Sequence, residues 1–178
     1  MLNYNKHFFI FIFFFYFSNL SAIENKIAYI NIDLILSNSI PSKSLFNQLK
    51  TLENIELEKL KNEEKKLKSE ENEISNTKNV ISNEEFLKNV DAFNNKVQIY
   101  QNKKKIIIQD LQKNRNKEVL NFLKLINPYI EEFMNSNSVD ILIEKKNIFI
   151  AKSNYDITEN VLEIINKQIK DFKILNDK

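Results

Sequence analysis

The sequence predicts an α+β protein with a small three-stranded β body, a long antiparallel helical hairpin that forms an arm, and a C-terminal helix. Three observations predict this class. Two β-rich stretches lie near the ends of the chain, a charged stretch with heptad spacing fills its middle, and a short amphipathic stretch follows the second β-rich region. We expect the body in residues 23–49 and 118–178, and the arm in residues 50–117.

Residues 1–22 have the pattern of a secretory signal peptide. Lys6 and His7 precede ten unbroken apolar residues, and small residues lead up to Ala22, after which we expect cleavage. The alternative is an uncleaved membrane anchor, but a spanning helix needs about 20 apolar residues. Cleavage would leave residues 23–178 with a net charge of about +1. An exported chain without cysteine suits a bacterial periplasm better than an extracellular disulfide scaffold.

The composition argues against catalysis and against cofactors. The chain has no Gly and no Cys, which excludes glycine-rich phosphate loops, disulfides, thiolate nucleophiles and cysteine-ligated zinc. Its single histidine lies in the segment that we expect to be removed. Glu63-Glu64 and Glu84-Glu85 are adjacent pairs, which do not face one another on a helix. We therefore expect no enzyme, no catalytic residue, no metal and no cofactor.

The start of the mature chain predicts a strand and then a helix. Residues 26–33 are largely apolar and β-rich, which predicts a buried strand. The sequence Ile40-Pro41-Ser42 is expected to break the chain, so that Ser42 or Ser44 caps a helix that begins with Leu45.

The charged stretch from 50 to 74 predicts the first leg of the arm. It contains six Lys and eight Glu, and its sparse apolar stripe consists of Leu60, Leu67 and Ile74. A helix with so thin a stripe is either one partner of a coiled coil or an exposed arm. Residues 75–83 predict the turn at the tip, where asparagine replaces glycine at any positive φ angle.

The second leg begins at a capping-box signature, with Ser82 as N-cap and Glu85 three residues later. We expect this helix to continue through Pro128, with a kink there, and to end at residues 135–138. Its stripe alternates steps of four and three residues, which is heptad spacing with one polar position. The stripe consists of Phe86, Val90, Phe93, Val97, Tyr100, Lys104, Ile107 and Leu111.

The C-terminal region predicts a β-hairpin and a helix. Residues 139–144 alternate apolar and polar side chains, residues 145–147 form a polar turn, and residues 148–151 return as the third strand. Asp156 with Glu159, or Thr158 alone, caps a helix whose apolar face holds Val161, Leu162, Ile165 and Ile169. A sheet this small has exposed edges, which favours a homo-oligomer.

This layout resembles the OmpH/Skp family of periplasmic chaperones. The similar segments are Lys26–Asp33 after a signal peptide, the charged hairpin, Val139–Glu144, and Tyr155–Thr158 before a helix that contains Val161-Leu162. The resemblance implies a homotrimer whose strands build a central β-barrel, with three helical arms that enclose unfolded outer-membrane proteins without ATP.

Two sets of residues are candidates for contacts with partners. The candidates for client binding lie on the second leg: Phe86, Val90, Phe93, Val97, Tyr100, Lys103, Lys104 and Lys105. A purely structural role is the alternative, in which the apolar residues pack against the first leg and the lysines form a solvated face. The lysines are also suited to weak contact with an anionic lipid surface. The second set belongs to the core or to the oligomer interface: Ile27, Ile30, Ile32, Ile141, Ile143, Ile148 and Ile150.

The leading hypothesis is thus an ATP-independent periplasmic holdase for unfolded outer-membrane proteins. The competing hypothesis is a structural or adaptor coiled coil whose stripe serves one fixed folded partner. Nucleic acid is not expected as a partner, because no aromatic platform accompanies the lysines.

Overall fold

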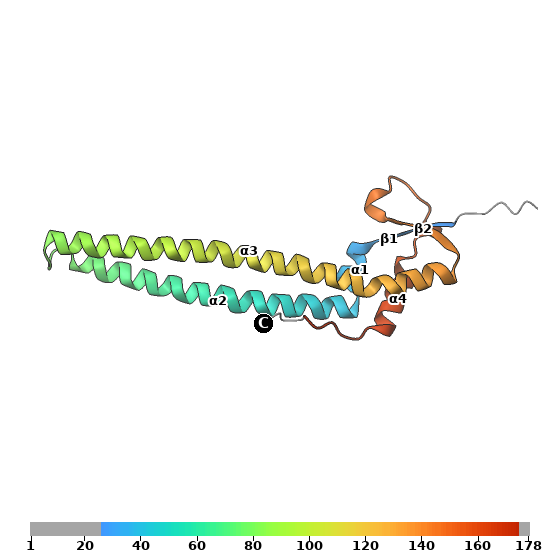
Figure 1. Cartoon of the computed structure of the whole chain (residues 1–178), viewed down its shortest axis with the longest axis horizontal. Coiled ribbons are helices and arrows are strands. Elements are labelled where there is room, and N and C mark those ends of the chain that lie inside the picture. Colours follow the sequence, from blue (N-terminus) through green and yellow to red (C-terminus); the bar gives the residue numbers. More distant parts are fainter. Residues whose placement is uncertain (1–25, 175–178) are drawn as a thin grey trace, which may run out of the picture.

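The computed structural model describes residues 26–174, and the proposed signal peptide lies outside them. Two long helices run side by side away from a small body that holds every other element (Figure 1). In chain order the elements are β1 (Lys26–Ile30), α1 (Ile32–Asn38), α2 (Ile40–Thr77), α3 (Asn83–Ser136), β2 (Val139–Glu144), the 3₁₀ turns η1 (Lys145–Asn147) and η2 (Ser153–Tyr155), and α4 (Thr158–Gln168).

The arm is an antiparallel pair formed by α2, of 38 residues, and the first two thirds of α3, of 54 residues. At 1.5 Å per residue the two helices are roughly 57 Å and 81 Å long. The tip turn, residues 78–82, is shorter than predicted because α2 continues to Thr77. No residue in it has a positive φ angle. Among the described residues, the positive φ angle of a non-glycine residue belongs to Ser138 alone, at 54° after α3.

The N-terminal strand is shorter than predicted. It ends at Ile30, because the side chain of Asn31 accepts a hydrogen bond from the Leu34 N–H, at 3.1 Å, and starts helix α1 there. The predicted caps Ser42 and Ser44 were wrong, because α2 already begins at Ile40. Ser39 caps α2, with its Oγ accepting from the Ser42 N–H at 3.3 Å, and proline is well tolerated in the first turn that follows.

Within residues 26–174 the sheet has two parallel strands, and the prediction of a third strand at residues 148–151 was wrong. β1 pairs with β2 from Lys26↔Val139 to Ile30↔Glu144. Residues 148–151 lie in no strand, and the side chain of Phe149 is fully exposed. A three-residue hairpin loop commonly places one residue at a positive φ angle, and none of residues 145–147 has one. Residues 145–147 instead form the 3₁₀ turn η1, which leads the chain away from the sheet.

Several predicted helix boundaries are confirmed. Ser82 is the N-cap of α3, and its Oγ accepts from the Glu85 N–H at 3.2 Å. The same helix continues through Pro128 and ends at Ser136. The predicted cap of α4 was wrong: its N-cap is Ile157, which makes no side-chain cap hydrogen bond, although the Asp156 carboxylate accepts from the Thr158 N–H at 3.0 Å.

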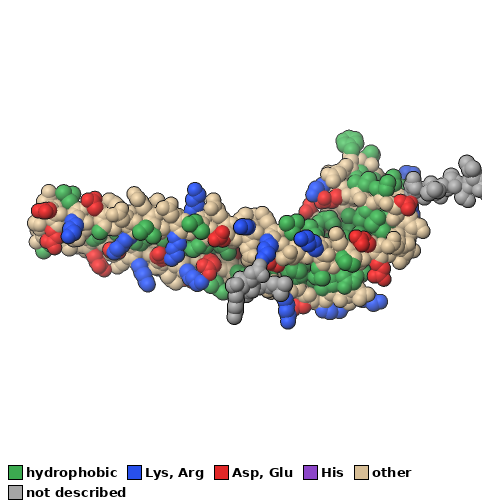
Figure 2. Space-filling view, in the orientation of Figure 1, with side chains coloured by type: hydrophobic (Ala, Val, Ile, Leu, Met, Phe, Trp, Pro, Cys, Tyr) green, Lys and Arg blue, Asp and Glu red, His purple; other side chains and the backbone are tan. Residues whose placement is uncertain are grey.

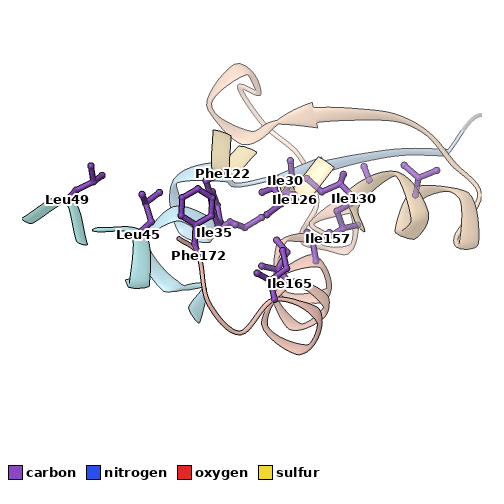
Figure 3. Packing of buried hydrophobic residues seen from close by; sticks show 14 residues of the cluster. Ile30, Ile35, Leu45, Leu49, Phe122, Ile126, Ile130, Ile157, Ile165 and Phe172 are labelled. Carbon is purple, nitrogen blue, oxygen red and sulfur yellow. The ribbon is translucent and has the colours of Figure 1, made fainter. Parts of the chain in front are cut away.

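The hydrophobic core lies where the arm joins the body (Figure 3). Phe122 and Ile126 of α3 are completely buried there, together with Ile35 of α1 and Leu45 of α2. The predicted apolar face of α4 is confirmed: Val161, Leu162, Ile165 and Ile169 are all buried. The core also contains Phe172, from an extended segment after α4 that was not predicted from the sequence.

Candidate functional site

The heptad stripe of α3 lies along the seam between the two helices of the arm. Phe86, Val90, Phe93 and Val97 are half-buried, and Tyr100 is 7% exposed. The Tyr100 hydroxyl lies 3.3 Å from the Leu60 carbonyl, to which it donates, and 3.2 Å from a carboxylate oxygen of Glu64. This seam is therefore filled by the chain's own α2 helix, which leaves the stripe only its half-exposed edges.

The Tyr100 side chain is held in its neutral form. Burial, and after it the negative charge of Glu64, raises the pKa of the Tyr100 hydroxyl above its usual value. The ammonium group of Lys104 lies 5.9 Å from the centre of the Tyr100 ring, within the range of a cation–π contact. This residue thus holds the two helices together and has almost no surface exposed to a partner.

The lysine run lies on the exposed surface of the arm. Lys103, Lys104 and Lys105 are all exposed, and Lys103 pairs with Glu63 of α2 at 2.6 Å. Positive and negative side chains alternate with apolar ones along the arm in Figure 2. Nearer the body, the guanidinium of Arg115 lies 5.1 Å from the centre of the Phe46 ring. The arm thus presents mixed charge with a local excess of lysine.

Outside the seam, the arm carries exposed apolar side chains that were not among the residues predicted from the sequence. Ile99 is 66% exposed and Ile106 is 56% exposed. The two residues are seven positions apart and therefore lie on one face of α3. Ile55, Leu57, Leu87 and Ile108 of the arm are also exposed. Their spacing is visible in the sequence, but the 4-3 stripe along the seam is the stronger periodic signal.

The strand isoleucines fall into a buried and an exposed group. Ile30 is 3% exposed, and Ile32 packs against the same core. Ile27, Ile141 and Ile150 are 44%, 47% and 84% exposed, respectively. Ile143 and Ile148 are half-buried.

The exposed strand residues meet a projecting loop at one end of the body. Ile27, Ile143, Ile148 and Ile150 line a groove of about 850 Å³. The loop that carries Phe149 projects next to it, and apolar side chains gather on this part of the body in Figure 2.

One carboxylate is buried at the foot of the arm. Glu118 is 1% exposed; its Oε2 accepts from the Asn121 side-chain amide at 3.3 Å, and its Oε1 has no hydrogen-bond partner. Within residues 26–174, no group of three or more His, Cys, Asp or Glu side chains is arranged to hold a metal ion. No helix among these residues combines the length and the apolar character needed to cross a membrane.

Comparisons with known proteins place this architecture in a family. The sequence profile of the family described as outer membrane protein, OmpH-like, matches residues 26–165. A solved structure from Caulobacter crescentus, described as a candidate OmpH-like outer membrane chaperone, has the same fold. It superposes with a TM-score of 0.76 at 16% sequence identity, over 86% of this chain and 94% of that chain. A comparison with curated protein sequences found no match. Because the profile covers most of the sequence, this chain belongs to the OmpH-like family of outer membrane proteins.

Proposed function

We propose that this chain is an ATP-independent periplasmic holdase that keeps unfolded outer-membrane proteins from aggregating. The observation that carries the proposal is the exposed apolar face of the arm, with Ile99 and Ile106 beside the lysines at 103–105. Membership of the OmpH-like family and the chaperone description of the structural neighbour support the same function.

The mechanism that we propose is the enclosure of a client by several arms. Apolar side chains spaced along a stiff helical pair offer many weak contacts, and lysines beside them attract acidic segments of the client. Weak contacts made together give avidity without fixing one pose, so release needs no nucleotide. The half-exposed edges of Phe86, Val90, Phe93 and Val97 extend this surface along the seam.

The oligomer that we propose is a homotrimer assembled through the strand end of the body. A two-stranded sheet leaves a strand edge open, and Ile27, Ile141 and Ile150 add exposed apolar area beside it. Assembly would cover both. Sedimentation equilibrium should show three chains for the wild type and a folded single chain for Ile141→Asp. An Ile141→Asp variant that still forms the full assembly would rule out this interface.

A light-scattering assay tests the holdase function. A urea-unfolded outer-membrane β-barrel protein is diluted into buffer with increasing amounts of the 23–178 chain and no nucleotide. We expect suppression of scattering that saturates near three chains per client. Absence of suppression at every ratio, from a chain with normal helical content, would favour the adaptor coiled coil, which would bind one folded protein instead.

A matched pair of variants tests the proposed surface. The double variant Ile99→Ser and Ile106→Ser should need at least about threefold more chain for half suppression, because apolar contact area is lost. Leu120→Ser changes a similarly exposed apolar residue, 58% exposed, beyond the arm on the same helix and should leave the ratio unchanged. Equal effects of both variants would contradict the assignment of the surface to the arm.

The exposed lysines are also proposed to give weak contact with anionic lipid surfaces. Binding to vesicles that contain an anionic lipid should weaken as salt rises toward 0.5 M, because the Debye length then shrinks to a few ångströms. Replacing Lys103, Lys104 and Lys105 with Gln should remove the salt-sensitive part of the binding. Binding that ignores salt and these substitutions would contradict the lipid contact.

A further inference from the structure

An extended segment after α4 lies against the first turns of α2. We call residues 169–174 the strap. It belongs to no helix or strand, and Figure 1 shows it running from α4 back along α2. The match to the family profile ends at residue 165, before the strap begins.

Gln48 of α2 recognises the backbone of the strap with both ends of its side-chain amide. Its Nε2 donates to the Phe172 carbonyl, and its Oε1 accepts from the Ile174 N–H at 3.3 Å. A carbonyl and the N–H two residues later are the pair that an extended chain presents to a neighbouring strand. The Ser44 hydroxyl adds hydrogen bonds to the Asp171 carboxylate and, at 3.4 Å, to the Phe172 carbonyl. Most of these hydrogen bonds are made to the backbone of the strap and therefore do not depend on its side chains.

From residue 171 to residue 174 the side chains of the strap alternate as those of a bound β-strand would. Phe172 is 8% exposed and lies edge-on to Phe122, with ring centres 5.9 Å apart and planes at 67°. Phe172 belongs to the same buried cluster as Leu45 and Leu49, and Figure 3 shows it beside Phe122. Ile174 is half-buried, whereas Asp171 and Lys173 are exposed. The strap thus inserts one aromatic side chain and keeps its charged ones in water.

We propose that the strap occupies a binding site for an extended peptide segment with an aromatic side chain. In this site Phe122 of α3 contributes the aromatic contact, and Gln48 of α2 hydrogen-bonds to the peptide backbone. A cavity of about 600 Å³ continues beside the strap, lined by Lys43, Asn47 and Leu52 among others, and gives room for a longer segment. The strap is then an intramolecular ligand that blocks the site until a stronger peptide displaces it.

The ligand class follows from the template that the strap provides. Strands of outer-membrane barrels alternate apolar and polar side chains and carry aromatic residues near both ends of the apolar band. Such a strand, while unfolded, offers the same alternation as the strap. The identification of the peptide with a client segment rests on the proposed holdase function; the existence of the site does not.

A peptide-binding measurement on the full 23–178 chain tests the site. The probe is a fluorescent peptide with the sequence of residues 169–174, followed by anisotropy. A tethered segment competes at an effective concentration on the order of mM, so weakening the strap by Phe172→Ala should tighten probe binding at least about tenfold. Adding Gln48→Leu to this variant should reverse the gain. A control peptide with Ala in place of Phe should bind neither chain.

Two outcomes of this measurement would overturn the proposal. One is a Phe172→Ala chain with normal helical content that binds the probe no better than the wild type. The other is equal binding of the control peptide, which would indicate unspecific apolar adsorption.

Hydrogen exchange on the wild-type chain gives a second test that needs no substitution at Phe172. Saturation with the unfolded client should speed amide exchange in residues 169–174, while the amides of residues 45–49 stay protected. Unchanged exchange in the strap, in a sample whose aggregation is fully suppressed, would remove the strap site and leave the holdase function standing. A chain that binds the probe but fails to suppress aggregation would contradict the holdase function and leave the strap site standing.

Discussion

The body and the arm are stabilised in different ways. The body cluster draws side chains from β1, α1, both long helices, α4 and the strap, and Phe122, Ile35 and Ile126 within it are completely buried. In residues 50–117, Leu60 and Tyr100 are the only large apolar side chains that are buried, at 3% and 7% exposure. Ion pairs such as Lys96–Glu70, at 2.5 Å, and Lys103–Glu63 join the legs at the surface, where each contributes little.

Buried packing is therefore concentrated in the body, and accessible apolar side chains are common along the arm. A helical pair with a thin seam leaves most of its apolar side chains accessible, which suits a surface for weak contacts. The core at the foot of the arm then has to hold both helices in place. Urea unfolding at one fixed chain concentration tests this division, because assembly would otherwise change the apparent stability.

The largest difference should appear between two phenylalanines of the same helix. Phe122→Ala in the core should lower the free energy of unfolding by about 3–5 kcal/mol, because it leaves a cavity in a closed cluster. Phe93→Ala in the half-buried seam should cost about 1 kcal/mol, because water fills the space. Equal losses would show that the arm is as tightly packed as the body.

Replacing the buried carboxylate at the foot of the arm should stabilise the chain. Glu118→Leu is expected to raise the free energy of unfolding by about 1–3 kcal/mol, because an unsatisfied oxygen is replaced by a side chain that packs. Glu71→Leu, at an exposed arm position, is the matched control and should change stability by less than about 0.5 kcal/mol. A loss of stability in Glu118→Leu would indicate that the carboxylate has a partner in the assembled protein.

The seam tyrosine should contribute a modest and pH-dependent amount. Tyr100→Phe removes hydrogen bonds to Leu60 and Glu64 and should cost about 1 kcal/mol at neutral pH. The folded pKa of Tyr100 is raised, so its contribution is complete below the unfolded value near 10. Above that pH the unfolded state loses its proton first, and the contribution falls as pH rises toward the folded pKa. The stability difference between wild type and variant should therefore shrink above pH 10; a constant difference would contradict the pKa shift.

The smallest expected effect concerns the left-handed residue after α3. Ser138→Gly should raise the free energy of unfolding by about 0.5–1 kcal/mol, because glycine has no Cβ to strain at a φ angle of 54°. Ser136→Gly, inside the last turn of α3, should lower it by a similar amount. If both variants lose stability, the backbone of Ser138 is unstrained.

Local patterns in the sequence were enough for most of the helical architecture. Three features depend on neighbours within four residues: the N-cap at Ser82, the apolar periodicity through Pro128 and the apolar face of α4. The membership of the OmpH-like family was also visible, from segments at both ends of the chain. The sequence alone predicts these features because helix caps and heptad patterns depend on residues that are close together in the chain.

Long-range packing determines which elements meet and which faces stay exposed. Lys26 pairs with Val139 across the whole arm, and period-two alternation alone did not show that residues 148–151 would leave the sheet. It also did not show that Ile141 would be exposed and Ile30 buried. The strap was missed because residues 169–174 acquire their order from Gln48 and Phe122, far away in the sequence. Long-range contacts of this kind depend on the packed geometry of the body, to which a local window of sequence has no access.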